Sequence, residues 1–234
     1  METLTQKLHD GLKPLYEELI NHCGPYCDES IVPFIVQWGK DFPTAERDGI
    51  LFVGRATHGW HNNDHNVDNL FDGDKKIFNR EDQMIWAKNY NSAFWYVIRN
   101  VSKHFYLQDE LNHVAWSNLC KLAPDAGNPN NTLFNLQLLN ACNILNKEVE
   151  ILSPKFIVMM TGLGWAENFI SSLNGNEWPS DEQIVAETVW SEPYKATVYK
   201  IANRYVILTE HPQGKDEQSL IKCLIHLISQ FKEI

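Results

Sequence analysis

Polar side chains that can do chemistry follow directly after an apolar run near residue 50 of this 234-residue chain. The segment reads ILFVGRATHGWHNNDH, residues 50–65, and it changes from strand-like residues to glycine, arginine, histidine, asparagine and aspartate. Histidine and aspartate can orient a water molecule or move a proton, and tryptophan can stack on a base or a sugar. The segment and the residues just after it therefore supply candidates for water activation, His58, His61, Asp64, His65 and Asp68, and one for stacking, Trp60.

Two interpretations of the histidine-rich turn stay open. His61 and His65 would share a face if the turn were helical, and together with His58 and Asp64 they could bind a metal ion. Glycine and asparagine favour a loop instead, in which the same side chains would line a polar site. Arg55 enters directly after the apolar run, where it binds an anionic group of a ligand or pairs with an acidic neighbour.

Three further polar clusters also follow apolar runs. They are SNLCKLAP (117–124), TGLGW (161–165) and TEHPQGK (209–215). The apolar runs predict strands at 49–54, 113–119 and 155–162, and a hairpin over 196–212 that turns at Asn203. Apolar residues at helical spacing predict helices near the N-terminus and at 84–105, 132–152, 162–170 and 216–231.

This alternation predicts an α/β protein, a three-layer α/β/α sandwich with a central, mainly parallel, four-stranded sheet. Ligands bind at the carboxyl ends of the strands in such sheets, so we expect the four polar clusters to line one cleft. The length suits a single domain over residues 1–234, in which 1–45 form an N-terminal helical and loop extension.

Composition narrows the classes of partner. The net charge of −10 and the scattered basic residues argue against an extended, non-specific DNA-binding surface. The sequence shows neither a membrane-spanning run nor a secretory signal, so a cytoplasmic protein without a membrane partner is expected, and no protein partner is indicated. Five cysteines in such a chain are expected to be reduced thiols, and no cofactor is expected from the residues alone.

The four strand ends, in this order, resemble the uracil-DNA glycosylase superfamily. VGRATHGW stands where the family has its first glycine-led turn, and WSNLCKLAP matches a strand that ends in asparagine before a loop of the K-C-x-P type. ILSPKFIVMMTG is similar to the family's helix end and following strand, and VILTEHPQG supplies the histidine and proline of the last motif. The resemblance covers residues from about 50 to the C-terminus, and it implies the uracil-DNA glycosylase-like fold.

The resemblance also implies roles for particular residues. These enzymes flip a base out of DNA and break the bond between the base and the sugar, so one group must read the base and another must stabilise its developing negative charge. Asn118 would read the base edge, and His211 would donate to the leaving oxygen. The turn that begins at Gly54 would line the pocket with its backbone, through Arg55, Ala56, Thr57 and His58.

Two departures from the family pattern matter. Arg55 and Ala56 stand where the family branches have a catalytic glutamate, aspartate or asparagine, and a methyl group can position no water. One branch also holds an iron–sulfur cluster, and Cys23, Cys27, Cys120 and Cys142 fall in comparable places, although three residues rather than two separate the first pair. The ordinary interpretation of these four residues is as unligated cysteines.

The sequence thus predicts a uracil-DNA glycosylase-like protein of the base-excision, DNA-repair type. It would hydrolyse the N-glycosidic bond of a flipped or free nucleobase, in DNA or a smaller substrate, with an atypical catalytic residue. One alternative is a catalytically inactive protein that binds a nucleobase or single-stranded DNA. Another is a metal-dependent hydrolase that uses the turn from His58 to His65.

Overall fold

A computed structural model describes residues 3–28, 30–43, 49–57, 65–71 and 89–232. The chain forms two compact units. Unit 1 comprises residues 1–37, 55–80 and 117–153, and unit 2 comprises residues 38–54, 81–116 and 154–234. Within the described residues, no helix has both the length and the apolar character needed to cross a membrane.

Unit 1 is built around two long helices that pack together, α1 (Leu4–Cys23) and α5 (Asn131–Leu152). Gly11 allows their close approach, because a Cβ atom there would lie 2.6 Å from Cδ1 of Ile151. The unit also contains the short helices η1 (Gly24–Tyr26) and α2 (Val67–Phe71), and an antiparallel pair of strands, β1 (Ile31–Pro33) and β5 (Leu122–Pro124). The predicted helices near the N-terminus and at 132–152 are confirmed.

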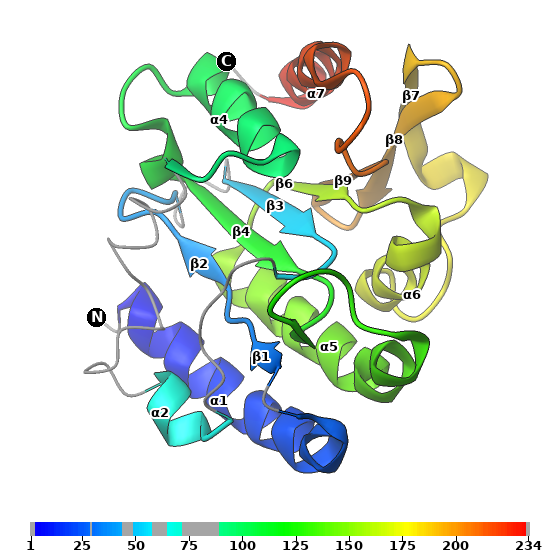
Figure 1. Cartoon of the computed structure of the whole chain (residues 1–234). Helices are drawn as coiled ribbons and strands as arrows, with labels where there is room; N and C mark the ends of the chain where they lie inside the picture. Colours follow the sequence, from blue (N-terminus) through cyan, green and yellow to red (C-terminus); the bar gives the residue numbers. More distant parts are fainter. Residues whose placement is uncertain (1–2, 29, 44–48, 58–64, 72–88, 233–234) are drawn as a thin grey trace. The chain divides into compact units, whose positions relative to one another are not determined.

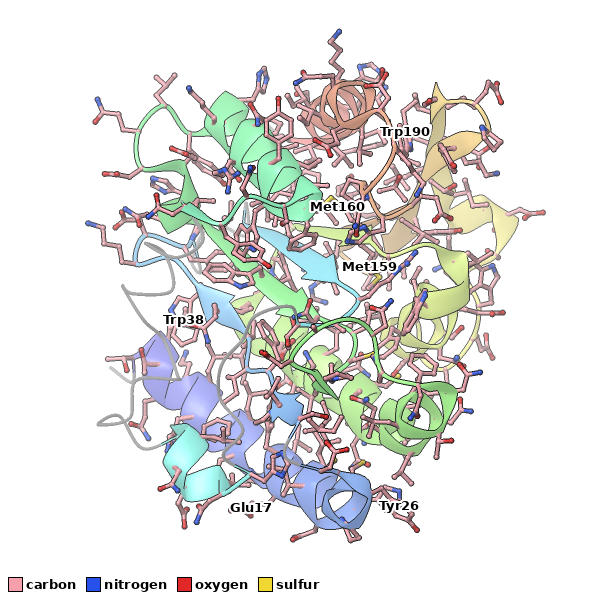
Figure 2. All side chains as sticks on the ribbon, viewed as in Figure 1. Glu17, Tyr26, Trp38, Met159, Met160 and Trp190 are labelled. Carbon is pink, nitrogen blue, oxygen red and sulfur yellow. The ribbon has the colours of Figure 1, made fainter. Side chains whose placement is uncertain are left out.

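Unit 2 is built on most of a seven-stranded sheet (Figure 1). Its central strands β3 (Ile50–Gly54), β6 (Phe156–Met160) and β9 (Arg204–Thr209) are parallel, with Phe52 opposite Val158 and Val158 opposite Ile207. β3 and β6 are buried at every position, and Figure 2 shows Met159 and Met160 among the side chains of the sheet. The full strand order is β2-β4-β3-β6-β9-β8-β7.

The outer strands of this sheet explain why one prediction was wrong. The sheet has seven strands of mixed direction, not four mainly parallel ones. β8 (Tyr194–Ile201) is the first arm of the predicted hairpin and runs antiparallel to β9, and β7 (Ile184–Ser191) runs antiparallel to β8. On the other side are β4 (Val114–Asn118), whose last two residues belong to unit 1, and the two-residue β2 (Gln37–Trp38).

Three α-helices complete the described part of unit 2. α4 (Ala93–Phe105) packs against α7 (Glu217–Phe231), and α6 (Leu163–Leu173) follows β6 directly. α7 begins as predicted, because the side chain of Asp216 accepts a hydrogen bond from the amide of Ser219. The remaining short helices are η3 (Glu110–His113) and η4 (Asp181–Gln183). The α/β class is therefore confirmed.

Candidate functional site

The turn after β3 and the loop after β4 are joined inside unit 1 by a backbone hydrogen bond. The amide of Cys120 donates to the carbonyl oxygen of Arg55 over 2.9 Å. Of the predicted binding residues in this turn, Arg55 and Ala56 are half-buried, and Thr57 is buried. The bond brings together two of the segments singled out in the sequence, although more than sixty residues separate Arg55 from Cys120.

The loop after β4 is held on several sides, and Lys121 is at its centre. The amide of Lys121 donates to Oε1 of Gln137 over 2.8 Å, and its carbonyl oxygen accepts from the amide of Phe34 over 2.8 Å. The Gln137 side chain also bonds both backbone groups of Leu122, over 2.9 and 2.8 Å. A loop with so many of its backbone groups paired is well defined, and it fixes the path of the chain next to Asn118.

A fully buried polar network anchors the same loop to α5. Nζ of Lys121 lies 2.8 Å from both carboxylate oxygens of Glu148 and 2.7 Å from Oγ of Ser117, whose hydroxyl donates to Glu148 over 2.6 Å. All three side chains are 0% exposed. Burial raises the pKa of Glu148 and lowers the pKa of Lys121, and each opposite charge counteracts that shift. The network binds the residues on both sides of Asn118.

Asn118 is the polar residue next to this loop whose side chain has no hydrogen-bond partner among the described residues. It is the last residue of β4 and only 7% exposed, yet among the described residues its amide group makes no hydrogen bond. The alternative that the side chain caps the strand end requires such a bond, so the structure does not support it. Neither amide atom of Asn118 is among the fully buried side-chain atoms that lack a partner, so the amide is accessible to a ligand, to which it offers one acceptor and two donors.

Thr57 is the second unpaired polar group near the Arg55–Cys120 bond. Its side chain is 4% exposed, and its hydroxyl is buried without a hydrogen-bond partner in the part of the chain that the structure describes. Leaving a buried hydroxyl unpaired costs about 1–3 kcal/mol of folding free energy. The Thr57 hydroxyl and the Asn118 amide, each within two residues of one end of that hydrogen bond, mark this part of unit 1 as the best candidate for ligand binding.

His211 belongs to unit 2 and follows the central strand β9. The amide of Gln213 donates to Nδ1 of His211 over 3.2 Å, so a neutral imidazole would carry its proton on Nε2. The ring plane of Phe94 lies at 8° to that of His211, with 6.4 Å between the ring centroids. A donor at Nε2 has the chemistry that the resemblance implies for this residue.

The histidine-rich turn lies mostly outside the described residues. His58, Trp60, His61 and Asp64 fall there, and the alternative of a metal-dependent hydrolase rests on them. The two described candidates have partners within the protein. Nε2 of His65 lies 2.7 Å from the carbonyl oxygen of Ile31, and Asp68 forms an ion pair of 2.6 Å with Lys13. Both contacts tie α2 to the rest of unit 1, which favours a structural role for His65 and Asp68.

The four cysteines named for an iron–sulfur cluster do not fit that group. All four are described, and within the described ranges no three histidine, cysteine, aspartate or glutamate side chains are placed to hold a metal ion. Burial raises the pKa of Cys23 to about 11 and that of Cys120 to about 12. Sγ of Cys27 instead contacts the carbonyl oxygen of Cys23 over 3.4 Å.

The sequence interpretation missed the network that supports Asn118. One signal was present, because Gln137 and Glu148 fall among the buried residues of α5, together with Ala141, Leu145 and Leu152. Polar residues on the apolar face of a helix are normally paired, and this predicts buried partners for both.

Comparison with models of known protein families and with curated proteins finds no match to this chain.

Proposed function

We propose that this chain is a uracil-DNA glycosylase-like protein of the three-layer α/β/α type, which binds a nucleobase at Asn118 and hydrolyses its N-glycosidic bond. The observation that carries the proposal is the amide of Asn118, a residue that is only 7% exposed, which makes no hydrogen bond among the described residues in a loop that is otherwise tightly bonded. An amide side chain matches the adjacent carbonyl and N–H groups of a keto base through two hydrogen bonds. Among the described residues the protein makes no use of this amide, so the amide can bind a ligand.

The reaction itself rests on the resemblance. Water adds to the sugar carbon, the bond to the base nitrogen breaks, and its electron pair leaves with the base, which finally takes a proton from the water. The resemblance gives His211 the task of stabilising the negative charge on the leaving base, and a neutral ring whose Nδ1 accepts from the Gln213 amide would carry its proton on Nε2. The group that orients the water remains a prediction among His58, His61 and Asp64.

A second candidate function is binding without hydrolysis, and Ala56 favours it. This residue stands where the family has a water-positioning side chain, and its methyl group can neither orient nor deprotonate water. The net charge of −10 weakens attraction to long polyanions, so a free base, a nucleoside or a short single strand is the expected ligand of such a protein.

The test is release of free base from single-stranded and double-stranded oligonucleotides that carry uracil, hypoxanthine or xanthine. Asn118→Ala removes two hydrogen bonds to the base and should lower release by about 5- to 150-fold. His211→Ala removes the donor to the leaving group and should lower the rate by about 10²- to 10³-fold. Asn135→Ala, at an exposed position of α5, is the matched control and should leave release unchanged.

The outcomes separate the two candidates. Release that Asn118→Ala reduces and Asn135→Ala leaves intact supports a glycosylase. Saturable binding of the base that depends on Asn118, with no release on any substrate, supports the binding protein. If neither release nor binding depends on Asn118, both candidates are refuted.

A further inference from the structure

The hydroxyl of Thr57 differs from those of the other buried threonines in the described part of the chain. Thr161 donates to the carbonyl oxygen of Gly162, Thr197 bonds Glu187, and Thr209 accepts from Nε1 of Trp190 over 2.9 Å. The Thr57 hydroxyl is buried and has no partner among the described residues. In the same described ranges, Ser102 of α4 has an equally unpaired buried hydroxyl, so the position of Thr57 in the chain carries the argument together with its lack of a partner.

The position of Thr57 relates it to Asn118. Thr57 follows Arg55 by two residues, and Asn118 precedes Cys120 by two residues, and Arg55 and Cys120 share the 2.9 Å backbone hydrogen bond. Thr57 is 4% exposed and Asn118 is 7% exposed. Two nearly buried polar side chains from distant parts of the sequence are thus both left unpaired beside one bond of unit 1.

We infer that the hydroxyl of Thr57 binds the same base as Asn118, and that it donates to the carbonyl oxygen of that base. The inference rests on the proposed function. The Asn118 amide pairs with the N–H group and with one lone pair of the neighbouring carbonyl oxygen, which leaves the second lone pair of that oxygen for a further donor. A threonine hydroxyl can supply this donor. The ligand class is therefore a keto base.

The test measures equilibrium binding of uracil to the full chain by calorimetry. Thr57→Val keeps the shape of the side chain and removes the hydroxyl, so it should weaken uracil binding by about 2- to 12-fold, while Thr57→Ser keeps the affinity. Pyrimidine has no carbonyl oxygen, so any binding of pyrimidine should be the same in the wild type and in Thr57→Val. The matched control is Ser102→Ala in α4, which also removes a buried hydroxyl without a partner among the described residues, and it should not change binding.

A second measurement separates a ligand-binding role from a structural one. Thr57→Val removes an unpaired buried hydroxyl, so without ligand its urea midpoint should be higher than that of the wild type. A variant that is less stable and binds uracil normally would overturn the inference, because the hydroxyl would then serve the fold. Equal losses with uracil and pyrimidine would also overturn it.

The proposed function can fail in a different way. If the wild type and Asn118→Ala bind uracil equally, or if the wild type does not bind it, Asn118 is not the base-reading residue and both ideas fall. If Asn118→Ala abolishes binding and Thr57→Val leaves it intact, only the role of Thr57 is refuted.

Discussion

The strongest stability prediction concerns the buried network of Ser117, Lys121 and Glu148. Lys121→Met leaves the Glu148 carboxylate in a fully buried position with Ser117 as its remaining donor, and Glu148→Leu leaves the Lys121 ammonium with Ser117 alone. Breaking one side of a buried ion pair costs about 3–5 kcal/mol. Because a domain is stable by only about 5–15 kcal/mol, either single substitution should bring the protein close to unfolding.

The double variant Lys121→Met/Glu148→Leu should be more stable than either single variant. It removes both charges together with the cost of burying them, and apolar replacements of buried ion pairs are often neutral or stabilising. The expected coupling between the two substitutions is therefore at least about 3 kcal/mol, which is large for neighbouring residues. Ser117 keeps a hydroxyl without a charged partner in the double variant, so some loss relative to the wild type is expected.

Urea denaturation followed by tryptophan fluorescence measures these differences in the free energy of unfolding. The comparison requires that this free energy falls with urea concentration by the same slope in every variant. Lys147 and Glu150 give the matched control, because they form a 2.7 Å ion pair on the exposed side of the same helix. Removing that pair should cost less than about 1 kcal/mol. If the effects of Lys121→Met and Glu148→Leu simply add, the two charges do not depend on each other and the reasoning from the network is refuted.

Three other predictions test separate features. Gly162 has φ +81° and ψ 154°, a conformation almost confined to glycine, and an added Cβ would lie 2.7 Å from Oε2 of Glu210, so Gly162→Ala should destabilise unit 2 by about 1–3 kcal/mol. Gly164→Ala, in α6 with open space around its Cα, should be neutral or slightly stabilising, and equal urea midpoints for the two variants would contradict the argument. Hydrogen bonds from Ser219 lower the pKa of Asp216, so the stability that wild type has over Asp216→Asn should be present at neutral pH and be lost as the pH falls below 3.8, through the folded-state value. A constant difference across that acid range would show that the Asp216 charge is not involved. Protein purified without oxygen should contain iron far below one cluster per chain, and Cys27, the half-buried thiol, should react with a thiol reagent before Cys23, Cys120 and Cys142. Stoichiometric iron and sulfide, with those four thiols protected, would reverse the conclusion on the cysteines.

The strands and helices that the sequence predicted are those with a strong local signal. β3 and β6 are apolar at every position because both faces are buried, and α7 begins at an aspartate that caps it. β7 gave no such signal, since it lies at the edge of the sheet and exposes Ile184, Val185 and Val189 instead of alternating apolar and polar residues. β2 has only two residues, which is too short for any period to be visible.

The candidate site was predictable in part for a related reason. Asn118 stands at the end of an apolar run, so its position at a strand end follows from local pattern and the rule for parallel sheets. The partners of Lys121 could not be found in this way, because Gln137 and Glu148 lie 16 and 27 residues further along the chain. Their pairing depends on how α5 packs against the loop, and a local sequence pattern carries no information about that contact.

In unit 1, hydrogen bonding distinguishes the residues that stabilise the fold from the residues that are candidates for ligand binding. Ser117, Lys121 and Glu148 satisfy one another completely, so changing any of them should alter stability first. Asn118 and Thr57 lack hydrogen bonds from their side chains among the described residues, so the protein gains no hydrogen-bond energy from them and their removal should alter ligand binding first. Burying the Thr57 hydroxyl without a partner in the described part of the chain costs folding free energy, and a ligand that bonds this hydroxyl would offset that cost.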